Sequence, residues 1–134
     1  MISIPKEVQE FLPGKLAWVA TSSPSGEPNV TPKGTLKLLD EQHITFADLF
    51  AGKTRQNLRD NAKIAVTVAD LTTNKAYQLK GVAELVESGD LFSNVAKALK
   101  QSHQGLPEPR YVVKIAVEAV FDQSGGSEPG KQIA

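Results

Sequence analysis

The residues with the clearest chemical potential are the glycine–lysine–threonine run at positions 52–54, which follows a short apolar segment ending in Asp48. A strand that ends in this way and opens a short helix is a common arrangement for holding a phosphate. Lys53 brings a positive charge, Thr54 a hydroxyl, and the first helical turn backbone N–H groups without intrahelical partners. Charge-assisted hydrogen bonds contribute about 1.5 to 3 kcal/mol each, so a few of them would anchor a phosphomonoester. Lys33 could supply a second cation from a neighbouring strand.

The same run partly matches the nucleotide-binding pattern G-x-x-x-x-G-K-[ST], with Ala47 in place of the first glycine. Leu49 and Phe50 occupy the part of that loop that should wrap the phosphates, and the helix that follows carries little apolar surface beyond Leu58. The next strand also begins before a crossover helix could be completed. We therefore set aside a small NTPase. A simpler structural alternative is that the run only begins a helix, with Thr54 as the N-cap.

Composition restricts the classes of partner. The chain has 134 residues, with 15 basic and 15 acidic side chains, so it has the size of one domain and no overall field that would recruit nucleic acid or an acidic membrane. Any anion site must therefore be local. The absence of cysteine excludes disulfides, thiolate catalysis and cysteine-type zinc sites. Residues 1–14 contain no apolar stretch long enough for a signal peptide or a membrane span, so we expect a cytoplasmic protein.

Hydrophobic periodicity predicts a mainly β protein, an antiparallel barrel of six or seven strands with a few peripheral helices. The expected strands cover residues 16–21, 29–31, 34–39, 43–48, 64–69, 76–86 and 111–121, and the expected helices residues 4–12, 54–61 and 88–101. Alternation around residues 34–39 places Lys33, Thr35 and Lys37 on one face. Gly81 predicts a bulge or a close approach of backbones. Residues 1–122 form the expected single domain, and the Gly-, Ser- and Pro-rich residues 123–134 a mobile tail.

Several segments occur together in the order of a known family. They are WVATSS at 18–23, a glycine turn at Gly26, PNVTPKG at 28–34, FAD at 46–48 and KTRQNL at 53–58. This series resembles the pyridoxamine-phosphate-oxidase-like FMN-binding proteins with a split-barrel fold, especially the small bacterial FMN-binding proteins. The similarity extends from about residue 16 to residue 89 and continues weakly into the last strand.

The resemblance implies a homodimer with one FMN per subunit, bound in a groove at the interface. The cofactor-binding residues that it implies are Thr31, Pro32, Lys33, Ala47, Asp48, Leu49, Lys53, Thr54 and Asn57. Lys53 and Thr54 would hold the phosphate, and Asn57 would support their loop from the next helical turn. The residues at 31–33 and 47–49 would run beside the ring and the ribityl chain, the second group through its backbone. Lys33 has two possible tasks, phosphate binding or placing positive charge near the pyrimidine end of the ring.

The implied function is that of a small flavin-dependent oxidoreductase or electron-transfer protein, with an unidentified redox partner or substrate. No catalytic side chain is expected, because the flavin carries the chemistry. A non-enzymatic flavin carrier or sensor and a deazaflavin-dependent reductase remain alternatives. Residues 125–131 lack the arginine-rich motif of the oxidase that makes pyridoxal phosphate, so that activity is not expected. His43 and His103 lie near a turn or a helix end and are expected to be solvated, and no metal site is expected.

Overall fold

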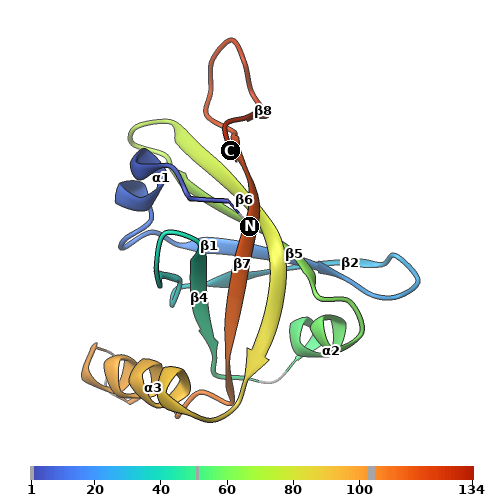
Figure 1. The fold of residues 1–134 in the computed structure, drawn as a ribbon, viewed down its shortest axis with the longest axis vertical. Coiled ribbons are helices and arrows are strands. Elements are labelled where there is room, and N and C mark those ends of the chain that lie inside the picture. The colour runs from blue at the N-terminus through green and yellow to red at the C-terminus, as the bar shows by residue number, and fades with distance from the viewer. Residues whose placement is uncertain (1, 51, 103–104) are drawn as a thin grey trace.

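The computed structural model describes residues 2–50, 52–102 and 105–134, and its elements follow one another along the chain as Figure 1 shows. They are α1 (Lys6–Phe11), β1 (Ala17–Ser22), β2 (Pro28–Lys33), β3 (Lys37–Leu38), β4 (His43–Asp48), α2 (Lys53–Asp60), β5 (Lys63–Asp70), β6 (Lys75–Val86), α3 (Asp90–Ser102), β7 (Tyr111–Asp122) and β8 (Lys131–Gln132).

The strands form one antiparallel sheet in the order β2-β1-β5-β6-β7-β4-β3, and the short β8 pairs with β7. The sheet curls without closing, because β2 and β3 are its two ends and do not pair with each other (Figure 1). The predicted class, a mainly β antiparallel split barrel with a few helices, is confirmed. None of the described helices is long and apolar enough to cross a membrane.

Alternation along the strands places one set of side chains inside the curl. In β1, Ala17 and Val19 are buried whereas Trp18 between them is exposed, and inward residues of the other strands, such as Phe46 and Ile115, join the same core. The N-terminal segment covers this core through its buried apolar residues Ile4, Val8 and Leu12. Burial of one strand face and of one stripe of α1 therefore accounts for the main architecture.

The bulge expected at Gly81 is present. The pairing of β6 with β7 shifts register between Lys80 and Gly81, and a Cβ atom at Gly81 would meet the backbone carbonyl oxygen of Ala116. Both strands are 12 residues long and bend around the core, so the extra residue gives the curvature that a split barrel needs.

One predicted strand is much shorter than expected. Residues 34–35 form a turn, so β2 ends at Lys33 and β3 covers only Lys37 and Leu38. The predicted common face of Lys33, Thr35 and Lys37 is therefore wrong. Period-two alternation holds only along a continuous strand, and the turn breaks its phase.

The C-terminal residues fold back on the barrel. Gln132 pairs with Phe121, the N–H of Val120 donates to the carbonyl of Ala134 at 3.0 Å, and Ile133 and Ala134 pack against the core. The mobility predicted for residues 123–134 and the domain limit at residue 122 stay predictions.

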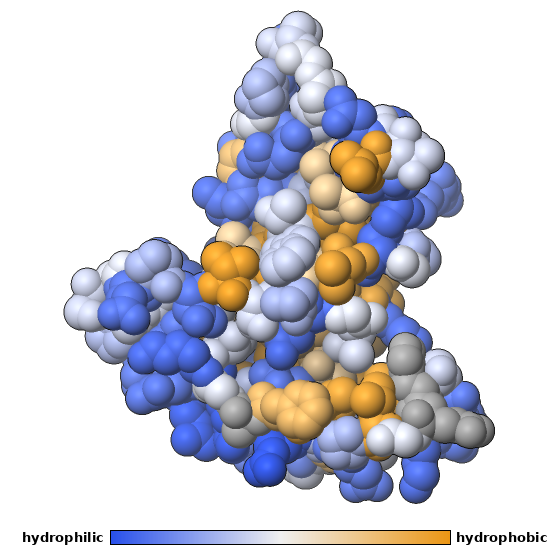
Figure 2. Space-filling view, turned by 180° about the vertical axis from the view of Figure 1, so that it is seen from behind, coloured by the Kyte–Doolittle hydropathy of each residue, from blue (hydrophilic) through white to orange (hydrophobic). Residues whose placement is uncertain are grey.

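Helix α3 lies at one end of the barrel, and among its described side chains Leu99 alone is fully buried. The apolar stripe on which the helix was predicted is half-buried. Figure 2 shows hydrophobic side chains gathered on the rear face at the end of the molecule that carries α3. The sheet therefore covers this helix only in part.

Candidate functional site

A polar cavity of about 220 Å³ lies at the open side of the barrel, between β2, the end of β4 and the start of α2. Its lining residues are Asn29, Val30, Thr31, Lys33, Asp48, Phe50, Gly52, Lys53 and Thr54. Five residues of the predicted cofactor site thus meet in one place. They come from three elements because the open edge of the sheet brings β2 beside the end of β4 and the start of α2.

The start of α2 faces this cavity. Gly52 is the N-cap, in an extended conformation, and the first intrahelical bond runs from the N–H of Gln56 to the carbonyl of Gly52 at 3.3 Å. Thr54 is thus the second residue of the helix rather than its N-cap. Its buried hydroxyl accepts a hydrogen bond from Asn29 Nδ2 at 3.4 Å, whereas Lys53 is exposed. The first-turn N–H groups and the Lys53 ammonium form an anion-binding arrangement.

Asn57 does not line the cavity but fixes the helix that does. Its side chain is buried, and Nδ2 donates to Thr21 Oγ1 at 3.0 Å, which ties α2 to β1. A buried amide that lost this partner would leave an unsatisfied group, so the contact restrains the position of the first turn. This geometry suits the supporting role predicted for Asn57.

Asp48 contributes its side chain to the site, although only backbone contacts were expected of it. The carboxylate is 2% exposed and lies 3.3 Å from the ammonium of Lys33. It also accepts hydrogen bonds from the N–H of Phe50 at 3.1 Å and from the hydroxyl of Tyr111 at 2.6 Å. The buried side of the cavity therefore contains an ion pair held by two further donors.

Tyr111 extends this network away from the cavity. Burial is the main cause that raises the pKa of Tyr111 far above its usual value, and the hydrogen bond to Asp48 with its negative charge adds to it. The guanidinium of Arg55 lies 5.3 Å from the centre of the tyrosine ring and pairs with Glu87 at 2.8 Å. Tyr111 therefore stays a neutral hydrogen-bond donor to Asp48.

The sequence interpretation missed Asn29, Tyr111 and Arg55. Asn29 lay within the segment that carried the resemblance, and alternation with Thr31 and Lys33 would have placed it on their face. Tyr111 contacts Asp48 because β4 and β7 pair with these two residues opposite each other. Nothing local in the sequence specifies that pairing.

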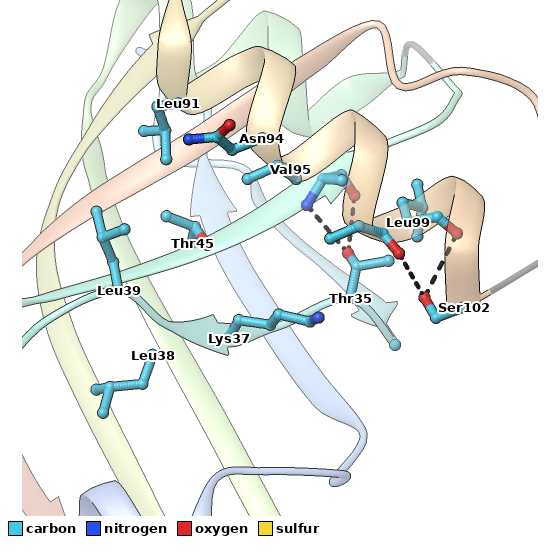
Figure 3. Close-up of a pocket in the computed structure, with 13 residues that line it drawn as sticks. Thr35, Lys37, Leu38, Leu39, Thr45, Leu91, Asn94, Val95, Leu99 and Ser102 are labelled. Carbon is cyan, nitrogen blue, oxygen red and sulfur yellow. Dashed lines mark hydrogen bonds between the residues drawn. The ribbon is translucent and has the colours of Figure 1, made fainter.

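A second, more apolar cavity of about 220 Å³ lies between α3 and the strands β3 and β4 (Figure 3). Its lining residues are Gly34, Thr35, Lys37, Leu38, Leu39, Thr45, Ala47, Leu91, Asn94, Val95, Ala98, Leu99 and Ser102. The Thr35 hydroxyl donates to the carbonyl of Ala47 at 2.9 Å and accepts from its N–H at 3.0 Å. Consecutive strand residues point to opposite faces, so β4 separates this cavity, beside Ala47, from the polar one beside Asp48.

Ala47 therefore lines a different cavity from the five predicted cofactor residues that meet in the polar one. Pro32 is exposed on β2 opposite Trp18, and Leu49 is half-buried just after β4; neither of these lines the polar cavity. His43 bonds to Asp40 through Nδ1 at 2.8 Å, and His103 lies outside the described residues.

In the part of the chain that the structure describes, no group of three or more His, Cys, Asp and Glu side chains is arranged to hold a metal.

The chain matches a known protein family over most of its length. Residues 4–124 match the model of the pyridoxamine 5'-phosphate oxidase family. An uncharacterised protein of Methanocaldococcus jannaschii is 31% identical to it over 139 residues, covering 100% of this chain and 90% of that protein.

Solved structures show the same fold. HupZ of Group A Streptococcus is 29% identical and covers 95% of this chain and 99% of its own, with a TM-score of 0.83. A putative pyridoxamine 5'-phosphate oxidase of Lactobacillus delbrueckii is 27% identical and covers 89% of this chain and 93% of its own, with a TM-score of 0.74.

The fold is also shared at lower identity. An FMN-binding protein of Syntrophomonas wolfei (16% identity, TM-score 0.73, covering 83% of this chain and 78% of its own) has it. An F420 reductase also has this fold, with 20% identity and a TM-score of 0.70, covering 87% of this chain and 98% of its own. HutZ, a haem storage protein of Vibrio cholerae, has it with 18% identity and a TM-score of 0.69, covering 92% of this chain and 98% of its own. At such identity the likeness shows the fold alone, and these three names indicate three different ligands.

Proposed function

Since the chain belongs to the pyridoxamine 5'-phosphate oxidase family, we propose that it is a flavoprotein that binds FMN, with the FMN phosphate in the polar cavity at the start of α2. The observation that carries the proposal is the convergence of three kinds of donor there. Lys53 brings an ammonium, Thr54 a hydroxyl, and the first turn of α2 its backbone N–H groups. This donor set fits a phosphomonoester.

The rim of the cavity suits the rest of a flavin. Val30 is 61% exposed and Phe50 is 69% exposed, and both line the polar cavity. Exposed apolar side chains beside a polar cavity favour a ligand with a charged end and a flat apolar body. The isoalloxazine ring would cover these side chains while the phosphate lay inside.

Bound FMN supplies hydride or electron transfer, and the residues of this chain bind it and orient it. We therefore propose an oxidoreductase or electron-transfer protein in which no side chain acts as catalyst. The phosphate site by itself would also accept the phosphate of a deazaflavin cofactor, and a flavin carrier or sensor would need the same cavity. These two alternatives are separated by experiment.

The test begins with the purified protein. We expect the visible spectrum of a bound flavin, FMN in the mass spectrum of the ligand released on denaturation, and tighter binding of added FMN than of riboflavin or F420. Anaerobic reduction of the bound flavin by reduced nicotinamide or by a partner reductant would identify an oxidoreductase. Flavin that binds but stays oxidised supports the carrier, and a colourless protein that fails to bind added FMN would refute the proposal.

Substitutions at the start of α2 locate the phosphate. Lys53→Ala and Thr54→Ala should each weaken FMN by about 10- to 100-fold and leave riboflavin within about 2-fold, because riboflavin lacks the phosphate. Lys6→Ala, which removes an exposed lysine from α1, is the matched control and should change neither affinity. Equal losses for both ligands would place the phosphate elsewhere.

A further inference from the structure

We propose that Asp48 is a positioning residue of the polar cavity: it holds the ammonium of Lys33 against the buried side and leaves Lys53 as the cation that binds the phosphate. The inference rests on the proposed function, because it concerns the same cavity. Of the two tasks open to Lys33, it favours placing positive charge near the flavin ring over binding the phosphate.

The two lysines differ in their surroundings. The side chain of Lys33 is 16% exposed, and its Nζ lies 3.3 Å from Asp48 Oδ1 and 5.8 Å from the centre of the Phe46 ring. Lys53 is exposed at the first position of α2, and among the ion pairs of the described residues it has none. If Lys33 moved to a phosphate, it would leave the Asp48 carboxylate buried and unpaired, which costs free energy. Lys53 is exposed and breaks no ion pair when it binds an anion, so Lys33 stays with Asp48.

The carboxylate itself is fixed. The Phe50 N–H donates to the same oxygen that faces Lys33, at 3.1 Å, and the Tyr111 hydroxyl donates to the other oxygen at 2.6 Å. These bonds come from the loop after β4 and from β7, so they hold the carboxylate from two directions. Both hydrogen bonds therefore hold the Asp48 carboxylate in place beside Lys33.

The side chains that line the cavity carry a net charge of one positive unit. The charges of Lys33 and Asp48 cancel each other, and the ammonium of Lys53 is left. Neutralising Asp48 alone would release a second cation toward the phosphate. Neutralising both members of the pair would leave the net charge as it was, and a neutral pair of similar volume leaves no buried charge unpaired.

The test compares FMN with riboflavin in the wild type and in three variants of the full chain by fluorescence titration. Asp48→Asn should raise the preference for FMN over riboflavin by about 5- to 10-fold, since it frees Lys33. The double variant Lys33→Met/Asp48→Asn should return that preference to within about 2-fold of the wild type. Asp60→Asn, which removes one exposed negative charge at the end of α2, is the matched control and should leave it unchanged.

A double variant that loses the FMN preference by about 10-fold or more would overturn the proposal, because Lys33 would then be a phosphate ligand. An Asp48→Asn protein with the wild-type preference would overturn it as well, and if that variant fails to fold the double variant decides alone. Failure of the proposed function looks different, because the wild type itself would then show no preference for FMN. A purely structural role for Asp48 would change stability and both affinities together.

Discussion

At the scale of single residues, the buried pair of Asp48 and Tyr111 shows how an ionisable group is kept in one state. The 2.6 Å bond needs the phenol as donor and the carboxylate as acceptor, so ionised tyrosine would place two negative charges in contact. Burial is the larger cause of the raised pKa, and it acts on Tyr77 as well. The folded state therefore favours the neutral form of both tyrosines.

This gives a prediction at alkaline pH. Both folded-state pKa values are raised, so the stability contributed by Tyr77 and Tyr111 is complete below the unfolded-state pKa of about 10 and falls as the pH rises above it. We expect the absorbance of tyrosinate to appear together with the loss of circular dichroism, in one transition. Tyrosinate that forms near pH 10 in a protein that is still folded would contradict the burial of these hydroxyls.

At the scale of elements, the bend in β6 and β7 lets the sheet curl around the core. The register shift after Lys80 allows both strands to pair with each other along the bend, and β7 pairs with β4 as well. β4 then delivers Asp48 to the cavity. The backbone contact at Gly81 is therefore a condition for the bend, since only a residue without a side chain fits against Ala116.

Gly81→Ala should lower the free energy of unfolding by about 1 to 3 kcal/mol, because the added Cβ would meet the backbone oxygen of Ala116. Gly34→Ala is the matched control, since a Cβ there meets open space, and it should stay within about 0.5 kcal/mol of the wild type. Urea unfolding measures the free energy of unfolding of the two variants and of the wild type. A Gly81→Ala protein as stable as the control would mean that β6 and β7 can separate at this point without cost.

At the scale of the whole molecule, apolar side chains remain on the outside of the curled sheet. Trp18 is 45% exposed on β1, opposite Pro32, and the next outward pair on these strands is Ala20 with the exposed Val30. An outward aromatic residue among apolar neighbours is typical of an interface. The family resemblance implies a homodimer, and we propose that its two subunits meet on the outer face of β1 and β2, next to the polar cavity that Val30 lines.

The wild type should then sediment as a dimer, and Trp18→Lys should shift it toward monomer and weaken FMN. Leu71→Lys is the matched control, because Leu71 is 96% exposed and lies in the turn between β5 and β6, outside β1 and β2. Sedimentation velocity with and without FMN measures both variants. A monomeric wild type that binds FMN tightly would contradict a cofactor site at an interface.

Local signals in the sequence determined most of the secondary structure of this protein and the position of its candidate anion site. Alternation of apolar and polar residues predicted the antiparallel strands, Gly81 predicted the bulge, and the run at 52–54 predicted a short helix start suited to an anion. Each of these depends on neighbours along the chain, since period-two burial and helix initiation are set within a few residues.

The tertiary structure decided which of these signals meet. The turn at residues 34–35 separated Lys33 from Thr35, and β4 divided Ala47 from Asp48 between two cavities. The pairing of β4 with β7 placed Tyr111 against a carboxylate 63 residues away. Alternation specifies the face of a residue on its own strand but not the partner strand, so the surroundings of Asp48, on which the roles proposed for the two lysines rest, follow from the fold alone.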